Sequence, residues 1–217
     1  MEAFLKSTLV IDWAKPEVLA RARMLRAGHI EHREIARRCF EWVRDEIRHS
    51  RDHRLDAVPC SASETLREGS GYCYAKSHLL AALLRANGIP AGFCYQRLSR
   101  DGEGAPYCLH ALNAVRLPGV GWHRVDARGN HGGIHAAFTP PYEKLAFAPA
   151  LRGERDFPEI WPEPLSVVVE SLQSAKSARV LHDRLPDVPV IDGEPHFAYV
   201  SPPEYGRLPR DSGDGGD

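Results

Sequence analysis

Apolar positions in the first third of the chain recur with helical spacing. Pro16 opens a predicted helix over residues 16–27, and Gly28 ends it. A longer amphipathic helix is predicted over residues 31–48, because its apolar residues fall on one face: Ile35, Cys39, Trp42, Val43 and Ile47. Ser61 and Glu64 have the spacing of a capping box, which predicts a short helix up to residue 68. Residues 7–12 are expected to be extended.

The next apolar segment predicts a helix packed against the core. It runs from Cys73 to Asn87, where Asn87-Gly88 supplies a left-handed stop. The leucines at positions 79, 80, 83 and 84 are expected to face the core. Gly69 and Gly71 permit a tight, irregular approach to the first turn.

After this helix the pattern changes to that of strands. Extended segments are predicted at residues 91–98, 107–116 and 121–126, with residues 118–121 as a turn between the last two. Helices first and strands afterwards indicate an α+β fold. In that fold, the helix that begins at Cys73 packs on an antiparallel sheet.

The C-terminal third is less regular. Residues 139–164 include proline-rich stretches, which predict irregular structure. The valines at 167–169 predict a strand over residues 165–171. A helix is expected near residues 173–184. Residues 210–217 are too polar and glycine-rich to fold. We expect a core over residues 1–150 that carries the chemistry, an extension over 151–206 that packs on it, and a disordered tail over 207–217.

Composition narrows the class of protein. The chain has 217 residues and a formal net charge of −1, so no long-range field attracts nucleic acid or a membrane surface. No apolar run approaches the roughly 20 residues of a membrane span, and no secretory leader is recognised at the N-terminus. The five cysteines are scattered and odd in number, which favours reduced thiols and a cytoplasmic location.

Cys73 is the candidate nucleophile. A cysteine in the first turn of a helix lies at the positive end of the helix dipole, which favours the thiolate over the thiol. The alternative is a packed, inert core cysteine, the usual state of free cysteines and the one we expect for the other four.

His110 and Asp126 lie in the two strands that flank the predicted turn. A five-residue loop would pair Val115 with Gly121 and place His110 directly opposite Asp126, on the same face of the hairpin. A two-residue loop would put the two side chains on opposite faces, and the sequence leaves this register open. A base that deprotonates Cys73 needs a carboxylate behind it to fix its tautomer, which favours the first register.

Taken together, these segments resemble the transglutaminase-like superfamily, whose core is papain-like. The resemblance covers roughly residues 30–130 and rests on five segments: residues 40–47, 63–73, 83–91, 109–111 and 122–126. It implies Cys73 as nucleophile, His110 as general base and Asp126 as the orienting carboxylate. Members include protein cross-linking enzymes, cysteine peptidases, amide hydrolases and proteins that have lost activity.

Metal and cofactor sites are not expected. The cysteines stand at 39, 60, 73, 94 and 108, without the paired Cys-x-x-Cys elements of the zinc-containing peptide-N-glycanase relatives. The chain is too short for the sandwich domains of animal cross-linking enzymes, and it has no Asp/Asn-rich calcium loop. The histidine pairs 49/53 and 131/135 are not predicted to bind metal, and the mixed-charge residues 44–54 are interpreted as a solvated helix end.

Three functions fit these residues. The first is a cysteine peptidase or amidase that cuts a protein, peptide or small amide substrate through a thioester on Cys73. The second is a transglutaminase, which shares every step up to the thioester and then transfers the acyl group to an amine. The third is an inactive binding module on the same fold. The acyl donor and the oligomeric state stay open, and the backbone N–H of Cys73 is the one oxyanion-hole donor that the sequence indicates.

Overall fold

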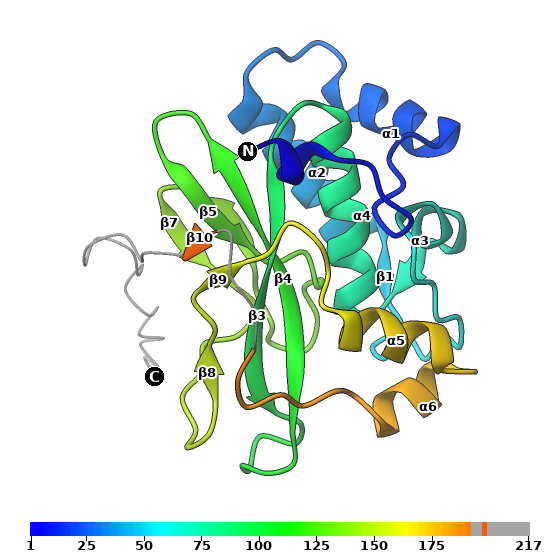
Figure 1. Ribbon diagram of the computed structural model, residues 1–217, viewed down its shortest axis with the longest axis vertical. Coiled ribbons are helices and arrows are strands. Elements are labelled where there is room, and N and C mark those ends of the chain that lie inside the picture. Colours follow the sequence, from blue (N-terminus) through cyan, green and yellow to red (C-terminus); the bar gives the residue numbers. More distant parts are fainter. Residues whose placement is uncertain (192–196, 199–217) are drawn as a thin grey trace, which may run out of the picture.

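A buried helix, α4 (Cys73–Ala86), stands at the centre of the fold. In the computed structural model, which describes residues 1–191 and 197–198, α4 is covered on one side by α1 (Pro16–Arg26), α2 (His32–Glu46) and α3 (Ala62–Glu68). Its other side packs on a sheet (Figure 1). Every residue from Cys73 to Arg85 is buried, so the helix is covered on all sides rather than only on its leucine face.

The sheet has the strand order β5-β4-β3-β8. The neighbours pair antiparallel: β3 (Ala91–Ser99) with β4 (Tyr107–Leu117), β4 with β5 (Gly121–Val125), and β3 with β8 (Arg155–Asp156). Helices packed on this sheet make the α+β, papain-like core that the sequence predicts, and that prediction is confirmed.

The predicted helices form where the local signals place them. The chain leaves α1, α3 and α4 through glycines with left-handed backbone, Gly28, Gly69 and Gly88, whose φ angles are 77°, 60° and 74°. Ser61 and Glu64 form both hydrogen bonds of the capping box at the start of α3. The observed bounds of α1, α2 and α4 agree with the expected ones to within two residues.

The register of the β4–β5 hairpin differs from both expected ones. Leu117 pairs with Gly121 and Asn113 with Val125, so the loop has three residues and the strands are shifted by two positions from the five-residue-loop register. Gly119 and Gly121 adopt positive φ angles of 73° and 87°, which permits this tighter turn. A shift of two keeps His110 and Asp126 on the same face, but as diagonal neighbours rather than directly opposite.

The mixed-charge residues 44–54 are not a solvated helix end, and that interpretation was wrong. The helix α2 ends at Glu46, and β1 (Arg48–His49) then pairs in parallel with β2 (Ser70–Gly71), the segment that leads into α4. This pairing buries His49 and Ser50. The alternating charges of residues 44–54 carry no local signal that the helix ends and a strand begins.

Two further expectations were wrong. Residues 7–12 form no strand, and residues 9–11 are a bend. The valine-rich segment forms α5 (Ser166–Ser174), not a strand, because Val168 and Leu172, four residues apart, are both buried on its inner face. The expected helix near 173–184 is shorter and begins later, as α6 (Ala178–Asp183).

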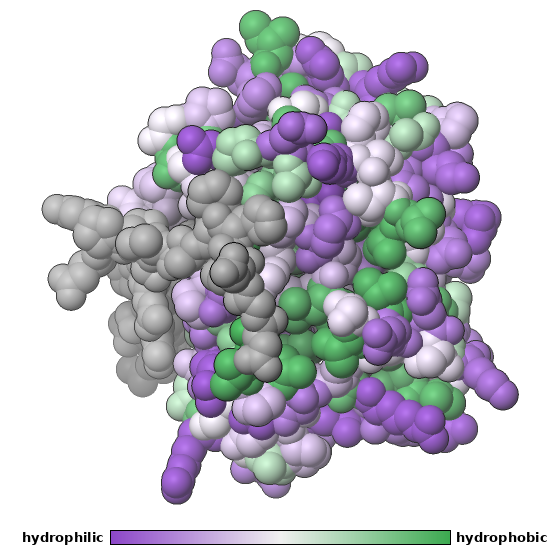
Figure 2. Space-filling model, in the orientation of Figure 1, coloured by the Kyte–Doolittle hydropathy of each residue, from purple (hydrophilic) through white to green (hydrophobic). Residues whose placement is uncertain are grey.

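The passage over residues 139–164 is irregular apart from very short strands. These are β6 (Ala137–Thr139), β7 (Tyr142–Lys144), β8 and β9 (Glu159–Ile160). The strand β9 pairs with β10 (Phe197–Ala198). At the other end of the chain, residues Glu2–Leu5 form a 3₁₀ helix, η1. On the face seen in Figure 2, hydrophilic residues cover most of the surface, and hydrophobic ones gather over its centre and lower part.

Segments beyond residue 150 contact the central helix and the sheet. The buried guanidinium of Arg85 on α4 donates hydrogen bonds to the carbonyls of Lys6, Ala91 and Pro162. The hydroxyl of Tyr95 accepts a hydrogen bond from the Leu165 N–H. The division at residue 150 stays a prediction, and the expected tail over 207–217 lies outside the described residues. Among the described helices, none is long and apolar enough to cross a membrane.

Candidate active site

Cys73 is the first residue of α4 and lies at the floor of a cavity. The chain reaches it through β2 and Tyr72, the N-cap residue, whose extended backbone turns into the helix. The backbone N–H groups of this first turn have no partner within the helix and point toward its N-terminus. The cavity has a volume of about 500 Å³, and its walls also carry His49, His110 and Phe147.

His110 and Asp126 meet beside the thiol. The Nε2 atom of His110 lies 2.7 Å from Oδ2 of Asp126, and both side chains are almost fully buried. Asp126 also accepts backbone hydrogen bonds from Arg128 at 3.1 Å and Ala146 at 3.2 Å. Because Nε2 faces the carboxylate, Nδ1 is the nitrogen of His110 that is left for Cys73. The structure therefore brings together all three residues that the sequence singles out.

Two hydroxyl groups of α4 hold the backbone on either side of His110. The hydroxyl of Tyr74 donates a hydrogen bond of 2.7 Å to the carbonyl of Leu109. The hydroxyl of Ser77 shares its single proton between the carbonyl of Cys73 on its own helix, at 2.8 Å, and the carbonyl of Ala111, at 3.2 Å. Since Tyr74 and Ser77 are on the same helix as Cys73, these contacts set where β4 presents His110 relative to the thiol.

The charges of the site favour a thiolate and an imidazolium. Burial acts to raise the pKa of Cys73, but His110 first and then His49 outweigh it, and the pKa falls below the ordinary thiol value. Burial acts to lower the pKa of His110, but the charges of Asp126 and Cys73 raise it above the ordinary imidazole value. Burial opposes the charge of Asp126 as well, yet His110 and two backbone N–H groups keep its pKa low.

The other four cysteines have the opposite electrostatics. Burial raises the pKa of Cys60 to about 11 and those of Cys39, Cys94 and Cys108 to about 12. His78, on the same helix as Cys73, is engaged elsewhere: its Nδ1 atom lies 2.7 Å from the carbonyl oxygen of Cys60. Across the part of the chain that the structure describes, no group of three or more His, Cys, Asp or Glu side chains could hold a metal ion.

Sequence reasoning missed His49. Its buried imidazole lines the cavity together with Cys73, packs on Tyr72 with ring centroids 5.3 Å apart, and helps to lower the pKa of the Cys73 thiol. Its Nδ1 atom lies 3.5 Å from Oδ1 of Asp52. Nothing in the linear pattern of residues 44–54 marks this position, because the parallel β1–β2 contact that buries it joins segments about twenty residues apart.

A larger hollow, about 820 Å³ in volume, lies elsewhere, between residues 7–15 and α3. Ser63 and Asp12 line it and bond to each other, with a distance of 2.5 Å between the Ser63 hydroxyl and the Asp12 carboxylate. Neither Cys73 nor His110 lines this hollow. The candidate nucleophile and the candidate base both line the smaller cavity.

A papain-like core with a thiol at the start of its central helix defines, in general terms, a thiol-dependent enzyme. Comparison of the sequence with known families agrees. The profile of the transglutaminase-like superfamily matches residues 20–127, and the chain belongs to this superfamily. No curated protein matches the chain.

Two solved structures resemble the chain in fold. The first is the crystal structure of a candidate cysteine protease from Cytophaga hutchinsonii. Its sequence is 21% identical, the TM-score is 0.45, and the match covers 58% of this chain and 40% of that chain. The second is the periplasmic domain of TgpA from Pseudomonas aeruginosa: 22% identity, TM-score 0.42, coverage of 57% and 45%. The chain thus covers less than half the length of either structure.

Proposed function

We propose that the protein is a cysteine hydrolase that cuts an amide or peptide bond through a thioester on Cys73. One observation carries the proposal: Cys73 and the His110–Asp126 pair meet at one cavity, and the pKa of this thiol alone among the five cysteines falls rather than rises. The contacts of Asp126 suit the role of an orienting carboxylate. Those of His110 suit a base that holds the thiol proton.

The reaction begins with attack of the Cys73 thiolate on the amide carbonyl carbon. A carbon–sulfur bond forms and the carbonyl π pair moves onto oxygen, giving an oxyanion. When the oxyanion collapses, the carbon–nitrogen bond breaks, and the His110 imidazolium gives its proton to the leaving amine. Water then attacks the thioester while His110 takes its proton, and the second collapse releases the acid and the thiolate.

Charges around the cavity favour water over an amine as the acyl acceptor. Arg51 and Arg100 line the wall, and the guanidinium of Arg100 is held by the carbonyl of His182. The one acidic residue among the lining residues, Glu154, is engaged by the backbone N–H groups of Ser99, Ala150 and Leu151. A protonated lysine side chain would meet like charges here, so hydrolysis fits this cavity better than the transglutaminase reaction does.

Intact-mass spectrometry tests the proposal. The protein is incubated with glutamine-containing peptides, with and without a primary amine. Hydrolysis predicts cleaved peptide, or a glutamine side chain converted to glutamate with release of ammonia, whether or not the amine is present. An amine adduct would instead identify a transglutaminase, and an unchanged peptide library would favour the inactive module.

Two variants make the test specific to the proposed nucleophile. Cys73→Ala should abolish turnover. Cys108→Ala is the matched control, because Cys108 lines the same cavity but has a raised pKa, and it should keep turnover close to that of the wild type. Loss of turnover in the control variant alone would overturn the assignment of Cys73.

A further inference from the structure

The thiol of Cys73 lies between two histidine–carboxylate pairs, of which the proposed mechanism uses one. We propose that His49, oriented by Asp52, is the side-chain donor that stabilises the oxyanion formed during acylation. This inference rests on the proposed function, because it assigns a second imidazole to the same reaction.

His49 and His110 approach the thiol from different elements. His110 is carried by β4, on the sheet side of α4, and His49 by β1, on the side of the helices (Figure 1). In the β1–β2 pair, His49 stands opposite Gly71, and the Ser50 N–H donates to the carbonyl of Gly71 at 3.1 Å. His49 is thus held beside the segment that leads into α4, toward which the first-turn N–H groups point.

Gly71 has no room for a side chain at this point. A Cβ atom there would lie 2.8 Å from the Cβ atom of Ala75, so β2 approaches the first turn of α4 as closely as a glycine allows. His49 is connected to the start of α4 through its pairing with this strand.

The contacts of His49 determine which nitrogen faces the reaction. Nδ1 lies 3.5 Å from the Asp52 carboxylate, an ion-pair contact, and forms no hydrogen bond among the described residues. Nε2 is therefore the nitrogen left for the cavity. An imidazolium carries N–H donors on both nitrogens, so it can face Asp52 with Nδ1–H and a developing negative charge with Nε2–H.

Arg128 connects the two carboxylates. Its guanidinium donates to the two oxygens of Asp52 at 2.7 and 2.9 Å, and its backbone N–H donates to Asp126 at 3.1 Å. Burial acts to raise the pKa of Asp52, but His49 and Arg128 together hold it well below its usual range. Asp52 is thus a fixed anion behind His49, as Asp126 is behind His110.

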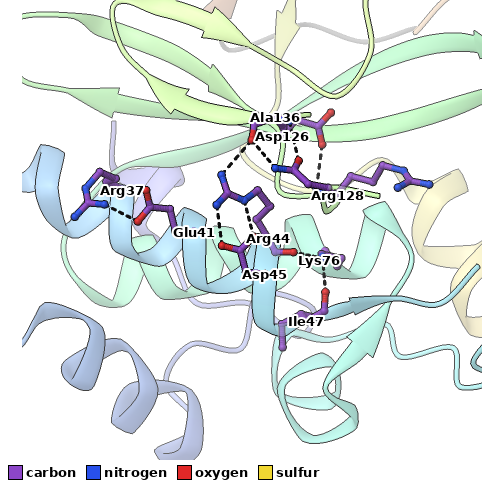
Figure 3. Close-up of polar contacts among 10 residues, drawn as sticks. Arg37, Glu41, Arg44, Asp45, Ile47, Lys76, Asp126, Arg128 and Ala136 are labelled. Carbon is purple, nitrogen blue, oxygen red and sulfur yellow. Dashed lines mark hydrogen bonds and ion pairs between the residues drawn. The ribbon is translucent and has the colours of Figure 1, made fainter. Parts of the chain in front are cut away.

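Lys76 fixes the chain just before β1. It lies one helical turn after Cys73 on α4, and its buried ammonium group donates to the carbonyls of Arg44 and Ile47 at the end of α2 (Figure 3). This contact links the helix that carries the thiol to the turn that delivers His49. The donor and the nucleophile are therefore positioned by the same helix.

The two imidazoles then have separate tasks. His110 moves the proton, as described above, because its Nδ1 atom faces the thiol and Asp126 supports its charge. His49 transfers no proton. An electron pair of the thiolate sulfur forms the new carbon–sulfur bond, and the carbonyl π pair moves onto oxygen. The Nε2–H of His49 and the backbone N–H of Cys73 both donate hydrogen bonds to that oxygen.

Two reactions of Cys73 separate this role from thiol activation. Alkylation by iodoacetamide displaces iodide at carbon and forms no oxyanion, so it reports the thiolate alone. Acylation by p-nitrophenyl acetate passes through an oxyanion and expels p-nitrophenolate, which needs no proton. Both rates are measured against pH in the wild type, in His49→Gln and in His49→Met. Glutamine keeps an N–H donor near the position of Nε2, and methionine has a similar length without a donor.

We expect His49→Met to lower the acylation rate at neutral pH, divided by the alkylation rate at the same pH, by about 10²–10³. Its plateau alkylation rate should stay within a few-fold of the wild type. His49→Gln should recover at least tenfold over His49→Met in acylation. The control is His53→Met, an exposed histidine four residues away that does not line the cavity, and it should leave both rates unchanged.

Each other outcome overturns a defined part of the argument. If the ratio of acylation to alkylation at neutral pH is the same in His49→Met as in the wild type, His49 only stabilises the thiolate and the inference fails, while the proposed function stands. If the wild type is acylated no faster than Cys73→Ala, the proposed function fails with it. Should His49→Met lack a cooperative melting transition, His49→Leu replaces it as the variant without a donor.

Discussion

Four of the five cysteines meet surroundings in which burial raises the pKa of the thiol, whereas Cys73 meets two imidazoles. The difference does not come from exposure, since Cys73 and Cys60 are both 7% exposed. It comes from charge: a buried thiol ionises only where a cation compensates for the lost water. The reactivity of each cysteine should therefore depend on the charges of the neighbouring side chains rather than on its solvent accessibility.

Iodoacetamide at neutral pH tests this directly. We expect Cys73 to be alkylated faster than Cys39, Cys60, Cys94 and Cys108, because it alone has a lowered pKa and the thiolate is the reacting form. Peptide mapping by mass spectrometry at short reaction times gives the five rates. Uniform labelling, or faster labelling of Cys108 at the same cavity, would contradict the assignment.

Asp126→Asn separates orientation from charge in the His110–Asp126 pair. The amide keeps the shape of the side chain but presents a donor or a neutral acceptor to Nε2 of His110, so the tautomer and the imidazolium lose their support. A cysteine–histidine pair that is already ionised depends on its carboxylate less than a serine triad does. We therefore expect turnover to fall by about 10–10³.

A melting curve accompanies that measurement, and the variant should keep its cooperative transition. Turnover equal to that of the wild type would make Asp126 a cap for the N–H groups of Arg128 and Ala146 and leave a catalytic dyad.

At the scale of elements, the site depends on how α4 is held against β4. The hydroxyls of Tyr74 and Ser77 reach the carbonyls on either side of His110, and the side-chain amide of Asn113 on β4 donates to the carbonyl of Ser77 at 3.1 Å. Buried hydrogen bonds of this kind fix the relative position of two elements because sliding would leave their polar groups without partners.

Tyr74→Phe should loosen this contact without emptying the core. Removing the hydroxyl leaves the ring in place but deprives the Leu109 carbonyl of a buried donor, which costs about 1–2 kcal/mol. For a chain of this size, the melting temperature should fall by roughly 2–8 °C. Tyr142→Phe, at an exposed tyrosine on β7, is the control and should melt with the wild type. Equal melting of both variants would show that the Tyr74 hydroxyl does not hold β4.

At the scale of the whole molecule, burial also sets how the fold responds to acid. Burial lowers the pKa of His78 to about 4, although its hydrogen bond with the Cys60 carbonyl acts in the other direction, and burial lowers the pKa of His123 to about 4. Both imidazoles are therefore neutral in the folded protein at neutral pH. In the unfolded chain they take up protons near the ordinary value of about 6.5.

The sign of the pH effect follows. As the pH falls, the unfolded state binds these protons before the folded state does. The contribution of the two neutral imidazoles to the free energy of unfolding is therefore complete above about pH 6.5 and is lost as the pH falls toward 4. We expect His78→Asn, which can keep a donor toward the Cys60 carbonyl but does not titrate, to narrow the gap in melting temperature between pH 7 and pH 5. His53→Asn, at an exposed position, should leave that gap as in the wild type. A gap in His78→Asn as wide as that of the wild type would assign acid sensitivity to other groups.

Local signals determined the helices and much of the site. Pro16, the Ser61–Glu64 capping box and the glycines at 28, 69 and 88 predict where helices begin and end, because caps act within a few residues of chain. Cys73, His110 and Asp126 could be named because a helix start and two short strands of one hairpin carry them. The period-two pattern of that hairpin kept the two side chains on one face even where the loop length was wrong.

Tertiary structure alone decided what depends on contacts between distant segments. The valines of α5 favour a strand by propensity, but Val168 and Leu172 are buried together only when the segment is helical. His49 reaches the thiol through a parallel pairing with Ser70–Gly71, and its partner Asp52 is held by Arg128, 76 positions further along the chain. No short-range pattern records such contacts. The free energy that selects them comes from packing segments remote in the chain, and it appears only once α4 and the sheet have brought those segments together.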